Sequence, residues 1–472
     1  MTRRSWIFPV FVALLVVSAC RKERIEPAAP KPPTTGAFSL RAAAAPYRGT
    51  TIRVLGESLP PLEALQKIAP AFERETGIKV QIEGFAYDVM IERGALDLTS
   101  RTGRYDVTLQ APESWGKFAA RGDLVPMDEF RRNQQLVDPS FDPGTQLFAK
   151  PAQDLGSFNG VTYGYPFSAL TMDLWYRKDL LTDPAEARSF KARYEYDLRV
   201  PATWKEYRDV AEFFTRPQKG LYGTLLQARR HPALWQEWLN FAYSFGGGTM
   251  AKAHAWDYGP IIVNSPETVA ATTYYKSLLP FAPPGTLEYT WDDALAAMQQ
   301  GKVVMALMWT DMSSAIEDPA ASRVAGKMGF SRLPEGAAGH VAQLSGSAYL
   351  IPRGSKNPNA AYLFIQWALR PENQIAQQLA GGQSGYKAVY SDPRVAALPY
   401  SRAVFETLQD GVSMRETVPE AGAIAEAVQI GLSDILQNRK TVQDGLDWIA
   451  AQMKKTLGAK AELKYPPQRP AA

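Results

Sequence analysis

Apolar and polar residues alternate along the chain in blocks that predict strands and helices in turn. The stretch TIRVLGES (51–58) is apolar enough to form a buried strand. The stretch after it places apolar residues at the spacing of one helix face: Leu62, Leu65, Ile68 and Phe72. Gly77 then supplies a helix stop, and KVQIEGF (79–85) alternates as a second strand. We expect a second helix over 88–100 and a third strand over 105–112.

The order strand, helix, strand, helix, strand favours right-handed crossovers and a mostly parallel α/β sheet. The same alternation returns further along the chain. Thr203 is expected to cap a helix, and 290–312 predicts a helix, a turn at Gly301 and an apolar strand. A short strand, a turn and a helix follow over 345–369, and 420–457 is expected to be helical. The pattern therefore predicts an α/β protein.

The beginning of the chain combines a positive start with a short apolar run. Arg3 and Arg4 precede an uncharged, mostly apolar stretch from Trp6 to Ala19. This stretch has the length of a signal-peptide core and falls short of the ~20 apolar residues of a transmembrane helix. Residues 1–19 are therefore predicted to be a signal peptide, which implies export to the cell envelope.

The only cysteine follows directly, in Val17-Ser18-Ala19-Cys20. A branched apolar residue, two small residues and a cysteine resemble a bacterial lipobox, whose cysteine becomes lipid-modified and forms the new N-terminus. We expect Cys20 to anchor the protein to a membrane, on the periplasmic or outer surface, because two or three acyl chains bind firmly where one does not. The alternative is a plain secretory signal with a chance cysteine. Residues 20–47 carry charges and prolines and are expected to form a disordered tether.

Composition and charge exclude several classes of function. The 472 residues favour two or three domains, and 46% of them are hydrophobic and 21% charged. The formal net charge is +4 with no basic block or stripe, so nucleic acid is not an expected partner. With one cysteine, which lipidation would consume, thiol catalysis, cysteine-zinc sites and iron–sulfur clusters are excluded. The three histidines, His231, His254 and His340, have no metal-ligand spacing.

Six segments, in this order, resemble the extracellular solute-binding proteins of ABC importers, in the family (family 1) that includes maltose-binding proteins. They are FERETGIKVQIE, YDVTLQAPESWGKFAARGDLVPMDEF, YGYPFSALTMDLWYRKDLL, PATWKEYRDVAEFF, ALAAMQQGKVVMALMW and GSAYLIPRGSKNPNAAYLFIQWALRPENQ. The resemblance implies a two-lobed periplasmic-binding-protein type II fold. Each lobe would be a mostly parallel sheet flanked by helices, with the ligand cleft between the lobes.

The resemblance also implies how the chain is divided. The predicted division is, in chain order, lobe 1 over 48–168, lobe 2 over 169–344, lobe 1 again over 345–393, lobe 2 again over 394–458, and a tail over 459–472. The chain would cross between lobes near 166–171, 343–347 and 392–396. Hinge bending at these crossings would close the cleft on a ligand.

Strand ends and the loops after them face the cleft in open α/β sheets, which selects the candidate ligand-binding residues. The first lobe would supply Glu57, Ser58, Tyr87, Gln110, Glu113 and Trp115. The second lobe and the second crossing would supply Thr171, Trp235, Trp238, Trp309, Asp311 and Ser345. Carboxylates and amides hydrogen-bond sugar hydroxyls, and Trp or Tyr covers the C–H face of a sugar ring. This inventory favours a carbohydrate.

Some of these residues also have structural explanations. Trp235 and Trp238 are three apart on an expected helix, so one of them can be core, and Glu113 can stabilise a helix N-terminus. Leu170 occupies the position where maltose-type relatives place an acidic sugar ligand. The maltose-type contacts are therefore not reproduced residue by residue.

The resemblance implies a monomeric, lipid-anchored binding protein that delivers its solute to permease subunits, with no cofactor and no metal. The same clamp could take a polyamine, a phosphate ester, an osmolyte or ferric iron, and Arg229 and Arg230 could supply phosphate ligands. A signalling or assembly lipoprotein with this fold is a further alternative. A hydrolase is not expected, because the chain has no G-x-S-x-G elbow and an acid pair cannot be identified from sequence.

Overall fold

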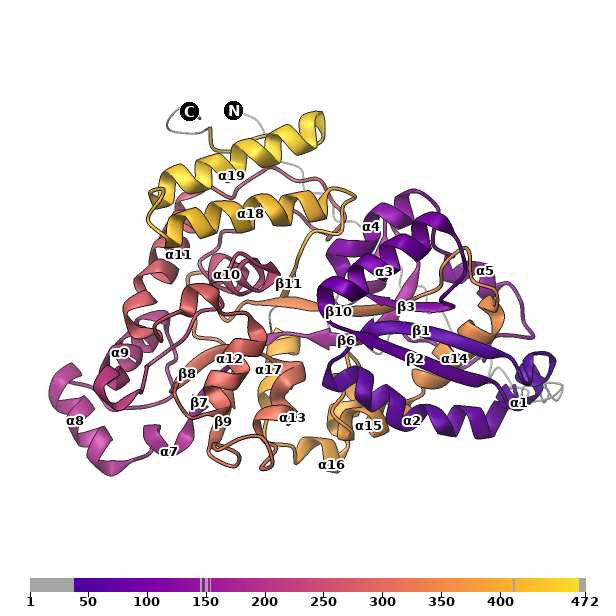
Figure 1. Ribbon diagram of the computed structural model, residues 1–472, viewed down its shortest axis with the longest axis horizontal. Helices are drawn as coiled ribbons and strands as arrows, with labels where there is room; N and C mark the ends of the chain where they lie inside the picture. The colour runs from indigo at the N-terminus through magenta and orange to yellow at the C-terminus, as the bar shows by residue number, and fades with distance from the viewer. Residues whose placement is uncertain (1–37, 145–146, 149–151, 153, 411, 467–472) are drawn as a thin grey trace, which may run out of the picture. The chain divides into compact units, whose positions relative to one another are not determined.

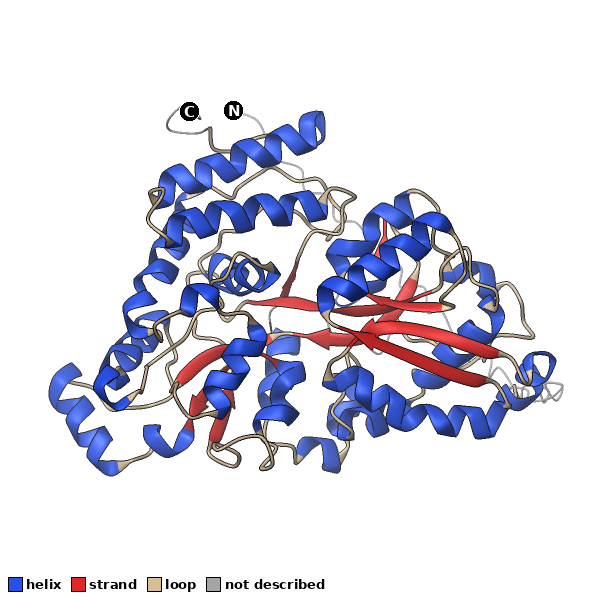
Figure 2. Ribbon diagram, viewed as in Figure 1, coloured by secondary structure: helices blue, strands red, loops and turns tan. Residues whose placement is uncertain are grey.

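The computed structural model describes residues 38–144, 147–148, 152, 154–410 and 412–466. The predicted signal peptide (1–19), Cys20, most of the predicted tether and the end of the predicted tail lie outside the described residues. Within the described part, strands and helices alternate along the chain as the hydrophobic pattern predicts (Figure 1, Figure 2).

The larger sheet has six strands in the order β11-β10-β3-β1-β2, and β6 also pairs with β10. Their bounds are β1 Thr51–Glu57, β2 Lys79–Phe85, β3 Val107–Gln110, β6 Gly164–Leu170, β10 Ala342–Leu350 and β11 Val412–Met414. Strand β1 runs parallel to both β2 and β3, which confirms the parallel units expected over 51–112. Strand β10 runs antiparallel to β3 and β6, so the sheet is mixed.

The smaller sheet has three strands in the order β8-β7-β9. Their bounds are β7 Met172–Arg177, β8 Met305–Trp309 and β9 Met328–Ser331. Strand β7 is antiparallel to both neighbours, which corrects the mostly parallel sheet expected in the second lobe. An apolar run predicts a strand but carries no direction, because the direction depends on where the preceding connection returns the chain. Strands β4 (Ser157–Phe158) and β5 (Val161–Thr162) form a separate hairpin.

Helices cover both sheets (Figure 2). The helices that belong with the larger sheet are α1 Leu40–Ala44, α2 Pro60–Thr76, α3 Tyr87–Ser100, α4 Pro112–Ala120, α5 Met127–Arg131, α14 Pro358–Ala368, α15 Pro371–Leu379 and α16 Pro393–Ala396. Those around the smaller sheet are α7 Lys178–Leu181, α8 Pro184–Tyr194, α9 Trp204–Phe214, α10 Pro232–Ser244, α11 Pro266–Ser277, α12 Trp291–Gln299, α13 Ser313–Ile316 and α17 Ser401–Asp410. Helices α18 (Ala421–Leu436) and α19 (Val442–Leu457) pack together beside α10 and α11 (Figure 1).

Each sheet has its own hydrophobic core, so the fold is two-lobed. Val54 and Phe364 lie in the core of the larger sheet, whereas Leu174 and Leu307 lie in that of the smaller sheet. Strand β6 continues into β7 through residues 170–171, at the first predicted crossing. Strand β10 pairs with β6 and also packs against α10. The division of the remaining chain between the lobes stays a prediction.

The folded part begins earlier than the sequence indicated. Ser39 caps α1, since its hydroxyl accepts a hydrogen bond from the Ala42 amide at 3.4 Å. Leu40 and Ala44 are buried, and α1 packs against α2 and α14. The predicted tether therefore does not extend to residue 47. Leu40 and Ala44 are about one helical turn apart. The alanines and prolines around them show no clear apolar face, so the helix was not predicted.

Several local predictions are confirmed. The Thr203 hydroxyl accepts from the Glu206 amide at 3.2 Å and caps α9. Gly77 ends α2 in the left-handed region with φ 75°, and Gly301 turns between α12 and β8 with φ 74°. Both values are accessible to glycine at little cost, which explains why glycine marks these ends.

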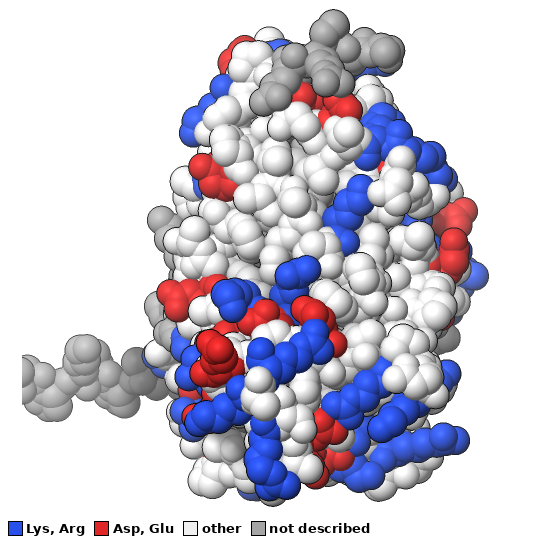
Figure 3. Space-filling view, turned by 90° about the vertical axis from the view of Figure 1, so that its left-hand side faces the viewer, with Lys and Arg blue, Asp and Glu red and all other residues white. Residues whose placement is uncertain are grey.

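Surface charge is mixed on the face shown in Figure 3. Basic and acidic side chains intersperse on its lower part, on the side where Figure 1 places α8 and α9. Ion pairs in this region include Lys205–Asp209 at 2.8 Å on α9, and Lys191–Asp197 at 2.8 Å between α8 and the loop after it. No helix in the described part of the chain is both long enough and apolar enough to cross a membrane.

Candidate functional site

A cavity lies where ends of both sheets and of several helices meet; we call it the ligand cavity. Its empty space, including the part that is open to solvent, is about 440 Å³. Its charged and polar lining residues are Glu57, Gln236, Asp311, Ser345, Ser347 and Arg415. Its remaining lining residues are Leu59, Tyr87, Ala111, Leu170, Trp291, Trp309, Met312 and Gly346.

The ends of regular elements deliver the main side chains to this cavity. Glu57 is the last residue of β1, and Tyr87 is the first residue of α3. Trp309 ends β8, and Asp311 lies in the 3₁₀ turn that follows it. These two pairs come from different lobes, and Ser345 adds a hydroxyl from β10, which touches both. Five of the predicted site residues are thus brought together.

Two carboxyl groups give the cavity its acidic side. Burial raises the pKa of Glu57 well above its usual value, and the nearby Asp311 carboxylate adds to the effect. Burial also raises the pKa of Asp311 to about 7, although backbone amides partly oppose the shift. The Oδ1 atom of Asp311 is buried and has no hydrogen-bond partner in the structure. Both groups can therefore accept hydrogen bonds from a ligand that enters the cavity.

Arg415 contributes a buried positive charge. Its guanidinium lies 3.0 Å from Glu113 Oε2 and donates to the Ser345 hydroxyl. It also lies over the Trp235 ring, 5.2 Å from the ring centroid. In the amide orientation that satisfies its neighbours, Gln343 accepts from Arg415 Nε at 3.0 Å. The Nη1 atom is buried without a partner, so it is available to a ligand.

Tyr87 and Glu113 form a hydrogen-bonded wall beside the cavity. The Tyr87 hydroxyl donates to Glu113 Oε1 at 2.7 Å, and Gln236 Nε2 donates to the same oxygen at 3.5 Å. The Tyr87 ring meets Trp291 edge-on, with 5.7 Å between the ring centroids. Tyr87 and Glu113 belong to α3 and α4, whereas Gln236 and Trp291 belong to α10 and α12. These contacts therefore join helices of the two lobes.

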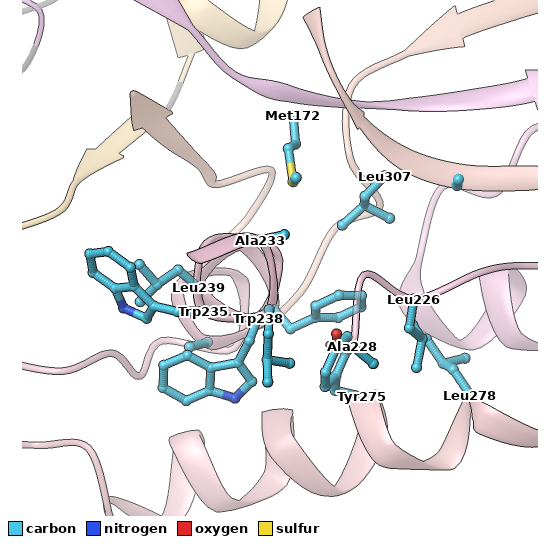
Figure 4. Close-up of a cluster of buried hydrophobic side chains, with 14 of the residues drawn as sticks. Met172, Leu226, Ala228, Ala233, Trp235, Trp238, Leu239, Tyr275, Leu278 and Leu307 are labelled. Carbon is cyan, nitrogen blue, oxygen red and sulfur yellow. The ribbon is translucent and has the colours of Figure 1, made fainter. Parts of the chain in front are cut away.

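Two predicted tryptophans lie in the core instead of the cavity. Trp115 is fully buried and packs against Phe158 and Tyr163, at centroid distances of 6.5 and 6.3 Å. The Nε1 atom of Trp238 donates to Thr272 Oγ1 on α11 at 2.9 Å. Figure 4 shows that the rings of Trp235 and Trp238 leave α10 in different directions. Helical spacing places residues on neighbouring faces, but it does not say which face looks toward the ligand.

The other predicted residues also lie outside the ligand cavity. Thr171 is buried at the crossing between β6 and β7, where its hydroxyl donates to Asp173 at 3.3 Å. Gln110 is buried and donates to the Thr108 hydroxyl at 2.7 Å. Ser58 is exposed just beyond the end of β1. Glu113 and Trp235 do not line the cavity but contact residues that do: Glu113 contacts Tyr87, Gln236 and Arg415, and Trp235 contacts Arg415.

Sequence reasoning did not select the other lining residues, and Arg415, Gln236 and Trp291 are the most important of them. Arg415 follows a three-residue strand, and no periodic pattern points to it. Gln236 lies between Trp235 and Trp238 on α10, on a helix that was predicted but could not be oriented. Trp291 is the first residue of α12, whose capping box at Thr290 and Asp293 was a usable signal for a helix end.

Comparison with known proteins agrees with this architecture. Residues 56–375 match the sequence profile of the family described as bacterial extracellular solute-binding protein. Among curated proteins, the mannitol-binding protein of Pseudomonas aeruginosa is 26% identical over 367 residues, which covers 73% of this chain and 76% of that protein.

Solved structures show the same fold. An ABC transporter solute-binding protein from Agrobacterium radiobacter, in complex with ribitol, superposes with a TM-score of 0.74 at 26% identity, over 86% of this chain and 99% of that one. The maltose-bound MalE3 of T. maritima superposes with a TM-score of 0.72 at 23% identity, over 86% of this chain and 100% of that one.

Proposed function

This chain belongs to the bacterial extracellular solute-binding protein family, and on that premise we propose that it captures a sugar or polyol for an ABC importer. Members of this family bind solutes and do not transform them, so the protein is not an enzyme. The finer proposal concerns the chemistry of the solute, which must suit the side chains that line the ligand cavity.

The observation that carries the proposal is the combination of Glu57, Asp311 and Arg415 with aromatic rings around one cavity. A polyhydroxylated ligand offers many hydroxyl groups, each of which can donate to a carboxylate or accept from a guanidinium. Its C–H groups can pack on Trp309, Trp291 or Tyr87. A purely apolar solute would leave the buried Asp311 oxygen and the Arg415 nitrogen unsatisfied, which is unfavourable.

Relatives support the same class of solute. The protein of P. aeruginosa is named as a mannitol-binding protein, and the structure from A. radiobacter is a complex with ribitol. Mannitol and ribitol are both linear polyols. Leu170 lines the ligand cavity, so an apolar side chain stands where maltose-type relatives have an acidic sugar ligand. These observations favour a polyol or a monosaccharide over maltose.

The alternative of a phosphorylated ligand has less support. Among the residues that the structure describes, Arg415 is the arginine that lines the ligand cavity, and it is already paired with Glu113. Arg229 and Arg230 are exposed and do not line the cavity. Two acidic residues facing the same space would repel a phosphate group.

We also propose that Cys20 carries a lipid anchor and that the protein delivers its solute to the permease of an importer. The lipobox-like sequence before Cys20 supports the anchor, and membership of the family supports the delivery. Replacing Cys20 by serine should prevent acyl labelling and lipoprotein-type processing. Normal acylation and release of a mature form in that variant would contradict the anchor.

A thermal-shift screen tests the proposed class of solute. Purified protein lacking residues 1–19 would be melted with sugars, polyols, polyamines and phosphate esters. A ligand at 100 times its Kd stabilises the folded form by about 2.7 kcal/mol, which raises the melting temperature measurably. We expect stabilisation by polyols or monosaccharides. Stabilisation only by polyamines or phosphate esters would contradict the proposal.

A further inference from the structure

A second, larger cavity adjoins the ligand cavity. Its empty space, including the part that is open to solvent, is about 860 Å³, compared with about 440 Å³ for the ligand cavity. Helices α3 and α4 line it on one side, and α10 and α18 line it on the other. Tyr87 lines both cavities. The two spaces are therefore neighbours that share this side chain.

Three side chains stand between the two cavities, and we call them the partition: Tyr87, Glu113 and Arg415. Tyr87 donates to Glu113 Oε1 at 2.7 Å, and Glu113 Oε2 lies 3.0 Å from the Arg415 guanidinium. Glu113 lines the second cavity, whereas Arg415 lines the ligand cavity. The Glu113 and Arg415 side chains are 8% and 1% exposed. Because the pair is buried, separating it would leave each charge without its partner.

The lining of the second cavity is itself suited to sugars. Asp88, Glu92, Lys117 and Gln429 offer polar groups, whereas Trp235 and Phe118 also line it but are almost completely buried. A chain of several sugar units could thus extend from one cavity into the other if the way were open. The aromatic ring and the buried ion pair of the partition close this passage between the cavities.

We propose that the partition, and Tyr87 in particular, sets the length of the ligand, so that the site accepts one sugar ring or one acyclic polyol and rejects longer oligosaccharides. This inference rests on the proposed function. Tyr87 acts by size, because its ring lies between the two cavities and lines both. The edge contact with Trp291 supports the ring from the opposite lobe.

Calorimetric titration with ligands of increasing length tests this inference. D-mannitol, D-glucose, maltose and maltotriose would be titrated into the wild type, Tyr87→Ala and Tyr87→Phe. We expect the wild type to bind mannitol or glucose at least ~100-fold more tightly than maltotriose, because a rigid site can exclude what does not fit. Tyr87→Ala should reduce this ratio by tenfold or more (~1.4 kcal/mol) by opening the passage.

Tyr87→Phe is the matched control, since it keeps the ring and removes only the hydroxyl. The ratio in this variant should stay within about threefold of the wild-type ratio. Wild-type binding of maltotriose as tightly as mannitol or glucose would overturn the inference while leaving the proposed function in place. If the wild type binds no sugar or polyol, the proposed function fails and the inference fails with it. If Tyr87→Ala does not fold, the affinities of the wild type for the four ligands of increasing length still test the inference.

Discussion

The carboxylate of Glu113, at the start of α4, lies 3.0 Å from the guanidinium of Arg415, which follows β11. The two residues are distant in sequence, yet both side chains are almost completely buried. Arg415 also donates to Ser345 on β10. One ion pair therefore ties together α4, β10 and the segment after β11, and it places the guanidinium at the ligand cavity.

The first prediction concerns this pair. Arg415→Met should destabilise the protein by ~3–5 kcal/mol, because Glu113 would be left buried without its partner. Chemical denaturation would measure the free energy of unfolding. In the double variant with Glu113→Gln, the loss should be smaller than the sum of the two single losses, because neither charge then remains. Simple additivity of the two losses would show that the groups do not interact.

The second prediction concerns Trp309, which is 5% exposed and lines the ligand cavity. Trp309→Ala should lower the affinity for the solute by ~30-fold, since truncating a buried aromatic contact typically costs ~2 kcal/mol of binding. Titration calorimetry would measure the affinity. The matched control is Trp238→Ala, which removes a core ring and should lower stability by ~3–5 kcal/mol without such a loss of affinity. An unchanged affinity in Trp309→Ala, together with a large drop in melting temperature, would make Trp309 a core residue.

The third prediction is a pH dependence of binding. The pKa of Asp311 is raised to about 7, and hydroxyl groups of a ligand bond best to its ionised form. Affinity should therefore increase from pH 6 to pH 8, by up to about tenfold per pH unit below the pKa. Asp311→Asn should weaken this dependence, whereas Asp197→Asn on the exposed surface should leave it unchanged. A pH profile that is identical in Asp311→Asn and the wild type would contradict the assigned role.

The fourth prediction concerns Asp173, which lies next to the crossing between the lobes. Thr407 donates to its Oδ1 at 2.9 Å, its Oδ2 has no hydrogen-bond partner in the structure, and burial raises its pKa to about 7. The folded state thus holds this proton more tightly than the unfolded chain, whose Asp pKa is about 3.9. Stability should fall as pH rises from about 4 to 7 and level off above, by at most about 1.4 kcal/mol per pH unit for this group.

Asp173→Asn removes this contribution and should make the stability curve less steep over the same interval. Asp311 and Glu237 have raised pKa values of the same sign, so part of the slope should remain in the variant. Urea denaturation at several pH values would measure the free energy of unfolding. A slope equal to that of the wild type would show that Asp173 titrates alike in the folded and unfolded chain.

The sequence could predict those parts of the site that depend on local pattern. Glu57 and Trp309 end apolar strands, and in an α/β fold strand ends face the cleft. Their places therefore followed from hydrophobic runs alone. The helices, their glycine stops and the Thr203 cap were predictable for the same reason, because capping is a short-range effect.

The rest of the site depends on long-range packing. Arg415 reaches the cavity because β11 pairs with β10, and no local pattern specifies that pairing. The rotation of α10 decides that Gln236 lines the cavity while Trp238 bonds to Thr272. The antiparallel direction of β7 likewise follows from the course of the chain between the lobes. None of these features is encoded within one element.

A crystal structure of the protein with the polyol or monosaccharide that stabilises it most would test the central claim directly. We expect the solute in the ligand cavity, with its hydroxyl groups within hydrogen-bonding distance of Glu57, Asp311 and Arg415 and its C–H groups against Trp309. We also expect the partition of Tyr87, Glu113 and Arg415 to separate the solute from the second cavity. A solute bound elsewhere, with the ligand cavity empty, would contradict the account.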